Sequence, residues 1–325
     1  MAAQENILMI RLKSIGDVLF TLPAVHAVRQ NFPDARLHFL VSKEHASLLR
    51  GFAEIDAVIP VDRKVYHAGK FSSACRDTFR LLRDLRQPEF SLTIDFQGYG
   101  ETAFLSWWTG APERWGSVYQ VARGWAYTHG IPRVSFAHPA EGSLALLREC
   151  GLHIGPVRNN FVLPEEMLAA ARGFFAANQL DTAKPTLFLQ PFTSTAHKNW
   201  PLENFLKLGW HWRSQGMQVI FGGGPADRAT LEPARAAGFP ISAGVPLLVT
   251  GGLMKLSTIV VGGDTGLLHL AVAMGRRVVM LMRSNLRGQT FPFQHPDWAV
   301  VAAPGQPISS VKIGAVIEAS RCAGM

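Results

Sequence analysis

Residues that could bind a phosphate follow an apolar, strand-like run at 256–261. The stretch GGDTGLLHL at 262–270 joins this run to a segment of helical character, and it contains Asp264, Thr265, Gly266 and His269. A helix N-terminus offers unpaired N–H groups and the positive end of the helix dipole, and a glycine there lets an anion approach the backbone. The stretch therefore favours a phosphate site, with a ligand-free Asp/Thr helix cap as the alternative.

A lysine and several hydroxyls follow a second strand-like run, TLFLQP at 186–191. The residues are Thr193, Ser194, Thr195 and Lys198 of PFTSTAHKNWP. Hydroxyls and one lysine suit a further contact to a diphosphate, because the lysine would neutralise charge that develops on a leaving group. The alternative is a polar loop before a helix that starts at Pro201.

A carboxylate stands at the first loop-to-helix junction of the chain. The stretch RLKSIGDVLFTLP at 11–23 places Gly16 and Asp17 there. A carboxylate that accepts the proton of an alcohol is a general base, and such a base contributes roughly 10²–10⁴-fold to a rate. Aspartate is also a common helix-capping residue, so capping is the alternative interpretation.

The glycine-rich turn FGGGPAD at 221–227 is a weaker signal. It resembles a dinucleotide-binding fingerprint, which would indicate a dehydrogenase or an epimerase, but the third glycine is absent. That hypothesis also leaves Asp17 and the Asp264–Thr265–Gly266 motif unexplained. A carboxylate just after the turn, Asp227, could instead accept hydrogen bonds from a ribose.

The elements that must position these residues alternate between strand and helix. Apolar residues at a helical spacing predict a helix over 18–33, and a helix with arginines at 76, 80, 83 and 86 follows the third strand. The alternation predicts parallel sheets covered by helices on both faces. Further helices are predicted over 201–216, 226–238, 249–257 and 266–275. The predicted strands are 7–12, 36–42, 57–62, 90–98, 186–191, 217–223, 240–242, 258–263 and 277–282.

The pattern restarts after a helix and loop at 164–184, which predicts two doubly wound, Rossmann-like α/β domains that face each other across a cleft. Ligands of such sheets lie beyond the carboxyl ends of the strands. The polar stretches at 13–17, 192–199, 222–227 and 262–266 all follow predicted strands, so we expect them at those ends.

Composition agrees with a packed two-domain protein, and its charge favours anionic partners, with a basic protein that binds nothing through its net charge as the alternative. The chain has 325 residues, of which 48% are hydrophobic and 17% charged, and its formal net charge is +8. This length suits two domains, and the apolar fraction argues against disorder. The positive charge favours phosphates, an anionic membrane face or nucleic acid, and by itself selects none of them.

No apolar run approaches 18 residues, and the N-terminus MAAQENILMI lacks a basic region followed by an apolar core. We therefore expect no transmembrane helix or signal peptide and a cytoplasmic location. Cys75, Cys150 and Cys322 show no C-x-x-C spacing, so we expect buried or inert thiols.

Together these motifs resemble the glycosyltransferase family of bacterial ADP-heptose:lipopolysaccharide heptosyltransferases, glycosyltransferase family 9. The resemblance runs from IRLKSIGDVLFTLPAVHAVR through TIDFQGYGETAFLSWWTGAPERWG and HPAEGSLALLRECGL to QPFTSTAHKNWP and VVGGDTGLLHLAVAMG. It implies the two-domain GT-B fold, with an acceptor-binding domain at 1–170 and a nucleotide-sugar-binding domain at 171–325. In that fold the last helix can pack back on the N-terminal domain.

The resemblance also implies roles for particular residues. Asp17 matches the catalytic base, and Lys198 matches the lysine that steadies the diphosphate. Other matched positions bind substrates. Those of the donor are Thr193, Ser194, Asp227, Asp264, Thr265, Gly266 and His269, and those of the anionic acceptor are Arg63, Lys64 and Arg123.

The implied reaction is inverting transfer of a heptose from ADP-L-glycero-D-manno-heptose to the lipopolysaccharide inner core. It implies no required cofactor or metal and no nucleic-acid partner. We expect peripheral contact with the cytoplasmic face of the inner membrane through the helix with arginines at 76, 80, 83 and 86. The alternatives are a solvated helix face, a different nucleotide sugar or acceptor, and a sugar-nucleotide-binding protein without turnover.

Two stretches depart from the family pattern. After RVVMLM the family usually has a Gly-Pro-Thr-like turn, whereas this chain continues RSNLRGQTFPFQHPDW. IPVDRKVYHAGKF has fewer basic residues than the corresponding family segment. The first departure predicts altered contacts to the donor, and the second predicts altered contacts to the acceptor.

Overall fold

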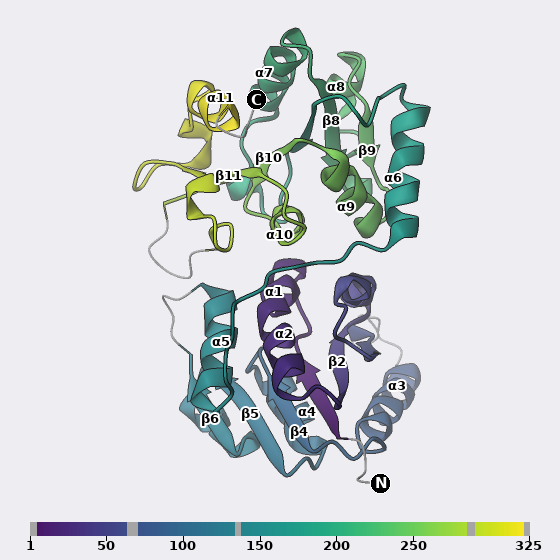
Figure 1. Ribbon diagram of the computed structural model, residues 1–325, viewed down its shortest axis with the longest axis vertical. Coiled ribbons are helices and arrows are strands. Elements are labelled where there is room, and N and C mark those ends of the chain that lie inside the picture. Colours follow the sequence, from purple (N-terminus) through teal and green to yellow (C-terminus); the bar gives the residue numbers. More distant parts are fainter. Residues whose placement is uncertain (1–4, 64–70, 134–137, 285–289, 322–325) are drawn as a thin grey trace. The chain divides into compact units, whose positions relative to one another are not determined.

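The computed structural model describes residues 5–63, 71–133, 138–284 and 290–321. The chain divides into two compact units, Met1–Asn159 (unit 1) and Asn160–Met325 (unit 2). Each unit is a parallel six-stranded sheet with helices (Figure 1), which confirms the predicted α/β class.

Unit 1 has the strand order β3-β2-β1-β4-β5-β6, and all neighbouring strands are parallel. β1 is buried almost throughout, as expected for the centre of a sheet covered on both faces. The strands are β1 (Asn6–Ile10), β2 (Arg36–Ser42), β3 (Ala57–Val61), β4 (Leu92–Asp95), β5 (Glu113–Val118) and β6 (His129–Pro132). The helices are α1 (Ile15–Leu19), α2 (Leu22–Asn31), η1 (Lys43–Gly51), α3 (Phe71–Asp84), α4 (Gly100–Trp108), η3 (Val121–Ala126) and α5 (Pro139–Glu149).

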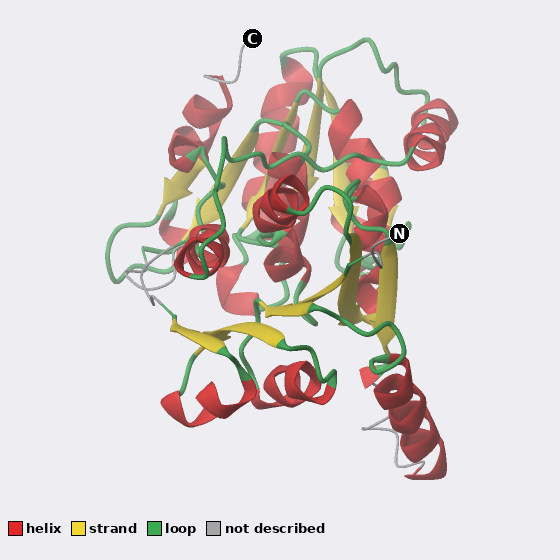
Figure 2. Cartoon of the chain, turned by 60° about the horizontal axis from the view of Figure 1, so that its bottom comes forward, coloured by secondary structure: helices red, strands yellow, loops and turns green. Residues whose placement is uncertain are grey.

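Unit 2 repeats this topology with the order β12-β11-β10-β7-β8-β9. Its strands are β7 (Thr186–Gln190), β8 (Gln218–Gly223), β9 (Ile241–Ala243), β10 (Ile259–Gly263), β11 (Val278–Met282) and β12 (Ala299–Val301). Its α-helices are α6 (Glu165–Ala177), α7 (Leu202–Ser214), α8 (Glu232–Ala236), α9 (Leu247–Leu256), α10 (Gly266–Ala273) and α11 (Ile313–Arg321). Short helical turns are η4 (Ala196–Lys198), η5 (Pro225–Asp227), η6 (Pro296–Trp298) and η7 (Ile308–Ser310). Figure 2 shows helices on both sides of the strands.

Both sheets are doubly wound. Successive strands are added toward one edge of the sheet in the first half of each unit and toward the other edge in the second half, so the winding reverses between the two central strands. These strands are β1 and β4 in unit 1, and β7 and β10 in unit 2. Ligands of doubly wound sheets bind beyond the carboxyl ends of the strands at such a switch point. A ligand is therefore expected at the loops after these four strands.

The predicted helix over 18–33 is two helices, α1 and α2, with a break at Phe20–Thr21. Pro23 is the second residue of α2, and a proline inside a continuous helix would remove one hydrogen bond and clash with a preceding carbonyl. The first helix begins at Ile15, so Asp17 lies within its first turn rather than in a loop. The predicted helix over 226–238 is likewise reduced to η5 and α8, with Pro233 near the start of α8.

The observed boundary between the units lies before α6, whereas the sequence placed it at 170/171, inside that helix. Helix α6 packs on α9 of unit 2, where Gly252 lies against Ala171. Helix α11 packs on α7, β11 and β12 of the same unit, with Val316 in the core. No helix in the described ranges is long and apolar enough to span a membrane.

Candidate active site

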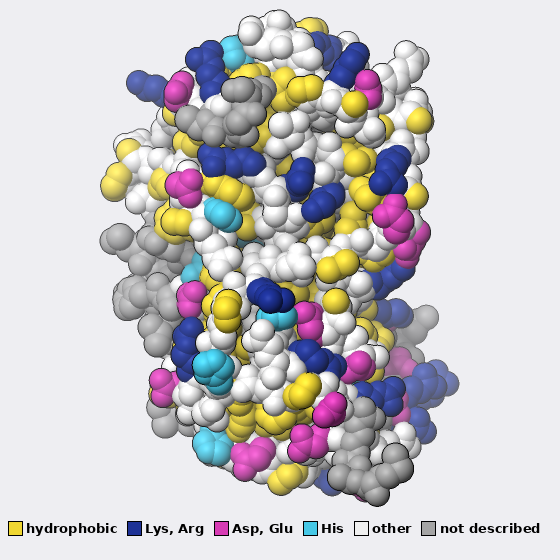
Figure 3. Space-filling model, in the orientation of Figure 1, with side chains coloured by type: hydrophobic (Ala, Val, Ile, Leu, Met, Phe, Trp, Pro, Cys, Tyr) yellow, Lys and Arg dark blue, Asp and Glu magenta, His cyan; other side chains and the backbone are white. Residues whose placement is uncertain are grey.

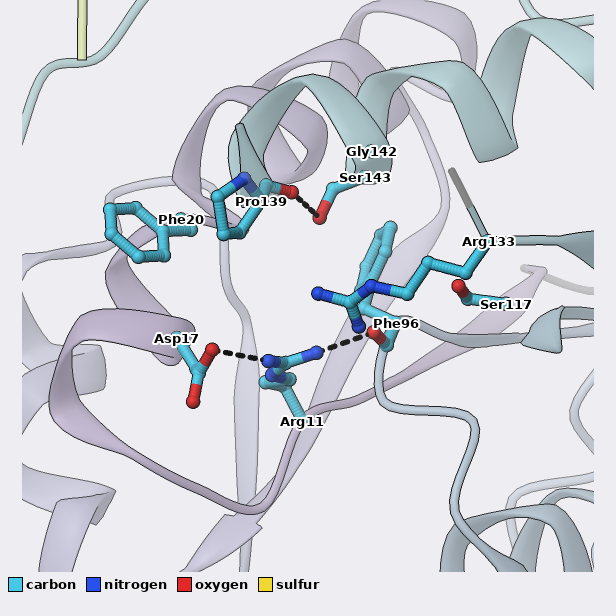
Figure 4. A pocket seen from close by; sticks show the side chains of 9 residues that line it. All are labelled: Arg11, Asp17, Phe20, Phe96, Ser117, Arg133, Pro139, Gly142 and Ser143. Carbon is cyan, nitrogen blue, oxygen red and sulfur yellow. Dashed lines mark hydrogen bonds and ion pairs between the residues drawn. The ribbon is translucent and has the colours of Figure 1, made fainter. Parts of the chain in front are cut away.

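In unit 1, Asp17 lines a small hollow at the carboxyl end of β1, together with Arg11, Phe96 and Arg133 (Figure 4). Arg11 follows β1 directly and its side chain is only 7% exposed. Its guanidinium donates to the Phe96 carbonyl at 2.6 Å and to Asp17 Oδ1 at 2.5 Å. A buried cation must be paired to be tolerated, so Arg11 and Asp17 hold each other in place.

The second oxygen of Asp17 accepts from Ser14, at 2.9 Å from its N–H and 3.1 Å from its hydroxyl. The bond from the N–H is the helix-capping interaction, so Asp17 does stabilise the start of α1. A carboxylate has about four lone-pair sites, and three described donors occupy three of them. One site remains for a substrate proton, and the side chain is 34% exposed. Capping and base catalysis are therefore compatible in this geometry.

The loop after β4 positions Arg11 from the other side of the switch point. Asp95 is fully buried and accepts from the N–H groups of Gln97 and Gly98 and from the Tyr127 hydroxyl. Burial raises the pKa of Asp95 above its usual value, and these hydrogen bonds offset only part of that rise. Gly98 has a φ of +69°, and a Cβ there would lie 1.6 Å from the Ser117 carbonyl oxygen, so only glycine fits.

The same loop supports the segment that leads to Asp17. Gln97 Oε1 accepts from the N–H groups of Leu12 at 2.9 Å and Lys13 at 3.3 Å. The carbonyl of Phe96 accepts from Arg11, as described above. The loop after β4 thus fixes both the backbone and the ion pair that orient the candidate base.

The predicted acceptor residues Arg63 and Arg123 lie around this loop. Arg63 donates to Glu101 of α4 through two nitrogens, at 3.2 and 3.0 Å, and Arg123 donates to the Gly98 carbonyl at 3.2 Å. Lys64 lies outside the described residues. Arg63 therefore already has a carboxylate partner where an acceptor anion was expected.

Arg11 and Arg133 are two residues that sequence reasoning missed. The guanidinium of Arg133 lies over the Tyr119 ring, 4.6 Å from its centroid. Burial lowers the pKa of Arg133, the nearby Arg11 cation lowers it further, and Asp17 and Tyr119 raise it. A signal for Arg11 was available, because an arginine at the end of the apolar run ILMIRL needs a buried partner.

In unit 2, Asp264 follows β10, and its carboxylate is contacted by the side chains of Lys198 and His269. Lys198 Nζ lies 2.6 Å from Asp264 Oδ2, and His269 Nε2 lies 3.1 Å from Oδ1. Burial raises the pKa of Asp264, but hydrogen bonds from His269 and Lys198 outweigh burial and lower it to about 2. The structure thus brings together three residues that the sequence assigned to the donor, and it buries His269 to 4% exposure.

The two glycines before Asp264 let the loop after β7 approach it. A Cβ on Gly263 would lie 2.7 Å from the Thr193 methyl carbon and 2.9 Å from the Lys198 carbonyl oxygen. A side chain at this position would push the loop after β7, which contains Lys198, away from the end of β10. The close approach explains why the strand ends on glycine.

Hydroxyls of the loop after β7 have different surroundings. Thr193 Oγ1 lies 2.9 Å from both the Thr195 carbonyl oxygen and Asn199 Oδ1, so it shapes the loop. Ser194 is exposed. Thr265 occupies the N-cap position of α10 and Gly266 is the first residue of the helix, which places N–H groups of the first turn beside Asp264.

Asp227 does not join this group. It closes the turn after β8, where its Oδ2 accepts from the Gly224 N–H at 2.7 Å. The structure gives it the same local capping geometry as Asp17, and among the described residues no buried arginine pairs with it. Its predicted contact to a ribose stays a prediction.

A hollow of about 360 Å³ lies beside Lys198 and Asp264, a volume in the range of small-molecule sites. Its lining includes residues that the sequence analysis left unassigned. They are His197, Leu281, Met282, Arg283, Ser284, Thr290, Phe291 and Ile308. Arg283 and Ser284 belong to the segment after β11 that departs from the family pattern, so this departure reaches the candidate donor site.

Comparison with known proteins places these observations in a family. Residues 78–314 match the model of glycosyltransferase family 9 (heptosyltransferase). The chain is 24% identical over 315 residues to lipopolysaccharide heptosyltransferase 1 of Escherichia coli O18:K1:H7, covering 96% of this chain and 95% of that protein. It is 22% identical over 309 residues to the lipopolysaccharide core heptosyltransferase OpsX of Haemophilus influenzae, covering 91% and 84%.

Solved structures share the fold. A glycosyltransferase family 9 protein of Veillonella parvula has a TM-score of 0.87 at 18% identity, with 99% of this chain and 98% of that chain covered. The E. coli heptosyltransferase WaaC with ADP has a TM-score of 0.79 at 22% identity, with 98% and 100% covered. The predicted GT-B architecture is confirmed by these likenesses. With the family model matching most of the chain, the protein belongs to glycosyltransferase family 9, the heptosyltransferases, and is a glycosyltransferase.

Proposed function

We propose that this protein transfers a heptose from ADP-L-glycero-D-manno-heptose to the inner core of lipopolysaccharide, with inversion at the anomeric carbon. In this reaction an acceptor hydroxyl oxygen forms a bond to the anomeric carbon while the bond from that carbon to the phosphate oxygen breaks. Asp17 takes the hydroxyl proton, and ADP leaves with the bond electrons. The observation that carries the proposal is the Asp17 carboxylate, fixed by Arg11 and Ser14 and left with one acceptor site.

Unit 2 supplies the donor site in this proposal. Lys198 faces the charge that forms on the diphosphate, and the first turn of α10 offers N–H groups to a phosphate oxygen. Arg283 and Thr290 line the same hollow and add a second cation and a hydroxyl. A WaaC structure with ADP and another with ADP-2-deoxy-2-fluoro heptose support an adenosine diphosphate donor for this fold.

Unit 1 supplies the acceptor site. Arg133 lines both the hollow with Asp17 and a larger neighbouring one of about 430 Å³, which Arg148 also lines. A sugar acid or a phosphorylated sugar in this place would meet cations beside the base. Arg63 and Arg123 lie nearby around the loop after β4, and an acceptor anion would compete with Glu101 for Arg63.

We also propose that turnover requires no metal and occurs at the cytoplasmic face of the inner membrane. Lys198 would supply the positive charge that a divalent cation supplies in other phosphate-transfer sites. Peripheral contact is proposed because the acceptor is anchored in a lipid layer and α3 carries several exposed arginines.

Two measurements test the proposal. In a thermal-shift comparison of ADP, UDP, GDP and NAD, ADP is expected to raise the midpoint most, and a ligand at 100 times its Kd stabilises by about 2.7 kcal/mol. Transfer to a purified, heptose-free lipopolysaccharide core is then measured with ADP-heptose, and the anomeric configuration of the product is determined. A preference for UDP would contradict the donor, and ADP binding without turnover would indicate a non-catalytic sugar-nucleotide-binding protein.

A further inference from the structure

Helix α4 and the turn η3 expose large aromatic side chains that the reaction does not use. Phe104, Trp107 and Trp125 are 39%, 44% and 58% exposed. The ring centroids of Trp107 and Trp125 lie 5.8 Å apart, and those of Phe104 and Trp107 lie 6.0 Å apart. Isolated apolar side chains are ordinary on a protein surface, but a contiguous exposed cluster marks an interaction site. We call these three residues the aromatic cluster.

Helix α3 presents a face that combines arginines with one aromatic ring. Arg76, Phe79, Arg80 and Arg83 are exposed and, at 3.6 residues per turn, fall within about 100° of the helix circumference. Phe79 is 72% exposed. Arg83 binds the adjacent Asp84. We call these four residues the arginine face, and Figure 3 shows Lys and Arg side chains gathered over α3.

The aromatic cluster and the arginine face belong to neighbouring helices. Trp108 at the end of α4 donates from Nε1 to the Leu82 carbonyl of α3 at 2.8 Å. Arg86, just after α3, lies over the Trp108 ring at 5.1 Å from its centroid. Leu85 and Leu105 share a core cluster, so both helices cover the same side of the sheet. Helix α3 lies at one margin of unit 1 (Figures 1 and 2).

This combination fits an anionic lipid surface better than a second copy of the chain. Tryptophan and phenylalanine partition into the headgroup region of a bilayer, and arginines next to it attract anionic headgroups. Two copies joined through the arginine face would bring like charges together, which opposes association. Charge complementarity therefore selects the lipid.

We propose that the aromatic cluster and the arginine face form a docking surface for anionic phospholipid. Trp107 and Trp125 enter the headgroup region, and the arginines face phosphates. The proposal rests on the proposed function in one respect, since a lipid-anchored acceptor gives the docking its purpose. Its physical basis is independent of the reaction, so each can fail without the other.

The test is flotation with phosphatidylcholine vesicles that do or do not contain phosphatidylglycerol. Wild-type protein is expected to bind the anionic vesicles, and less so at high salt. Arg76→Gln/Arg80→Gln/Arg83→Gln should weaken that binding by about two orders of magnitude, since each arginine contributes about fivefold. Arg80→Gln alone should weaken it about fivefold, which keeps the test valid if the triple variant folds poorly.

Trp107→Ser/Trp125→Ser should weaken vesicle binding and reduce fluorescence quenching by brominated phosphatidylcholine. The matched control is Trp210→Ser on α7, because Trp210 is 50% exposed and Arg213 lies 5.0 Å from its ring centroid. This control should bind vesicles like wild type. Wild-type vesicle binding by the Trp107/Trp125 variant would overturn the proposal, as would an altered oligomeric state with unchanged vesicle binding.

Transfer to a lipid-free core fragment separates this proposal from the proposed function. The surface variants should retain wild-type transfer to that fragment while losing transfer to acceptor in vesicles. Vesicle binding without any transfer would contradict the reaction and leave the docking surface standing. Efficient transfer by wild-type protein that does not bind anionic vesicles would contradict the docking surface alone.

Discussion

Arg11 and Asp17 form an ion pair of 2.5 Å in which the arginine is almost fully buried and the carboxylate is one-third exposed. The pair joins the end of β1 to the first turn of α1, and the Phe96 carbonyl holds the arginine from the loop after β4. A carboxylate paired with a buried cation keeps one orientation, because rotating the carboxylate would leave that cation unpaired. This relationship determines what a substitution of either residue should do.

Asp17→Asn should lower kcat by roughly 10²–10⁴, because an amide cannot take the acceptor proton. The thermal shift by ADP should persist, since the candidate nucleotide site is in unit 2. The free energy of unfolding should fall by more than it does when asparagine replaces a capping aspartate elsewhere, because Arg11 also loses its charged, buried partner. Asp227→Asn is the stability control, as Asp227 has the same capping bond without an arginine. Near-normal turnover in Asp17→Asn would leave only the capping role.

Lys198→Ala should weaken donor binding and also lower kcat, by about 10²–10³ if it acts as a charge stabiliser at the leaving diphosphate. The thermal shift by ADP should shrink, in contrast to Asp17→Asn. Lys207→Ala, an exposed lysine on α7, is the matched control and should behave like wild type. An unchanged ADP shift in Lys198→Ala would place the diphosphate elsewhere.

Gly263→Ala should lower ADP affinity and destabilise the protein by about 1–3 kcal/mol, the usual range for overpacking. The added Cβ would meet the Lys198 carbonyl oxygen and the Thr193 methyl group at less than 3 Å. Gly173→Ala on α6 is the control, because no atom of the described part of the chain lies within 4 Å of a Cβ there. That helical substitution should be neutral or stabilise by up to about 1 kcal/mol. Equal effects of the two changes on ADP affinity would contradict the proposal that Gly263 lets the Lys198-containing loop after β7 approach Asp264.

Acid should remove a stabilising contribution of Asp264. Its pKa is about 2 in the folded protein against 3.8 for the free side chain, so the contribution is complete above about pH 4 and is lost as the pH falls through 2. It amounts to about 2 kcal/mol, of which about half should be lost by pH 3. Urea unfolding from pH 5 to pH 3 measures it. Asp264→Asn should differ from wild type less at pH 3 than at pH 5, and a constant difference would contradict the depressed pKa.

The sequence predicted the sheets and the polar loops at the carboxyl ends of their strands because apolar strands and glycine-rich ends are local signals. It could not predict that Asp17 and Arg11 pair, because their geometry depends on Phe96, about eighty residues further along the chain. Arg133 was missed for the same reason, since only the pairing of β5 with β6 brings it to the hollow beside Asp17. Pro23 and Pro233 are local signals of a helix start, and each indicates a break within one of the two long predicted helices.

The identical strand order of the two sheets has an evolutionary consequence. Each unit has its own core and its own switch point, so mutations in the proposed acceptor pocket of unit 1 need not disturb the folding of unit 2, the proposed nucleotide-binding half. Selection can therefore diversify the acceptor while the activated sugar stays the same, or the reverse. Chimeras of family members joined between residues 159 and 160 would exchange one unit, and with it the substrate specificity proposed for that unit, while keeping the other.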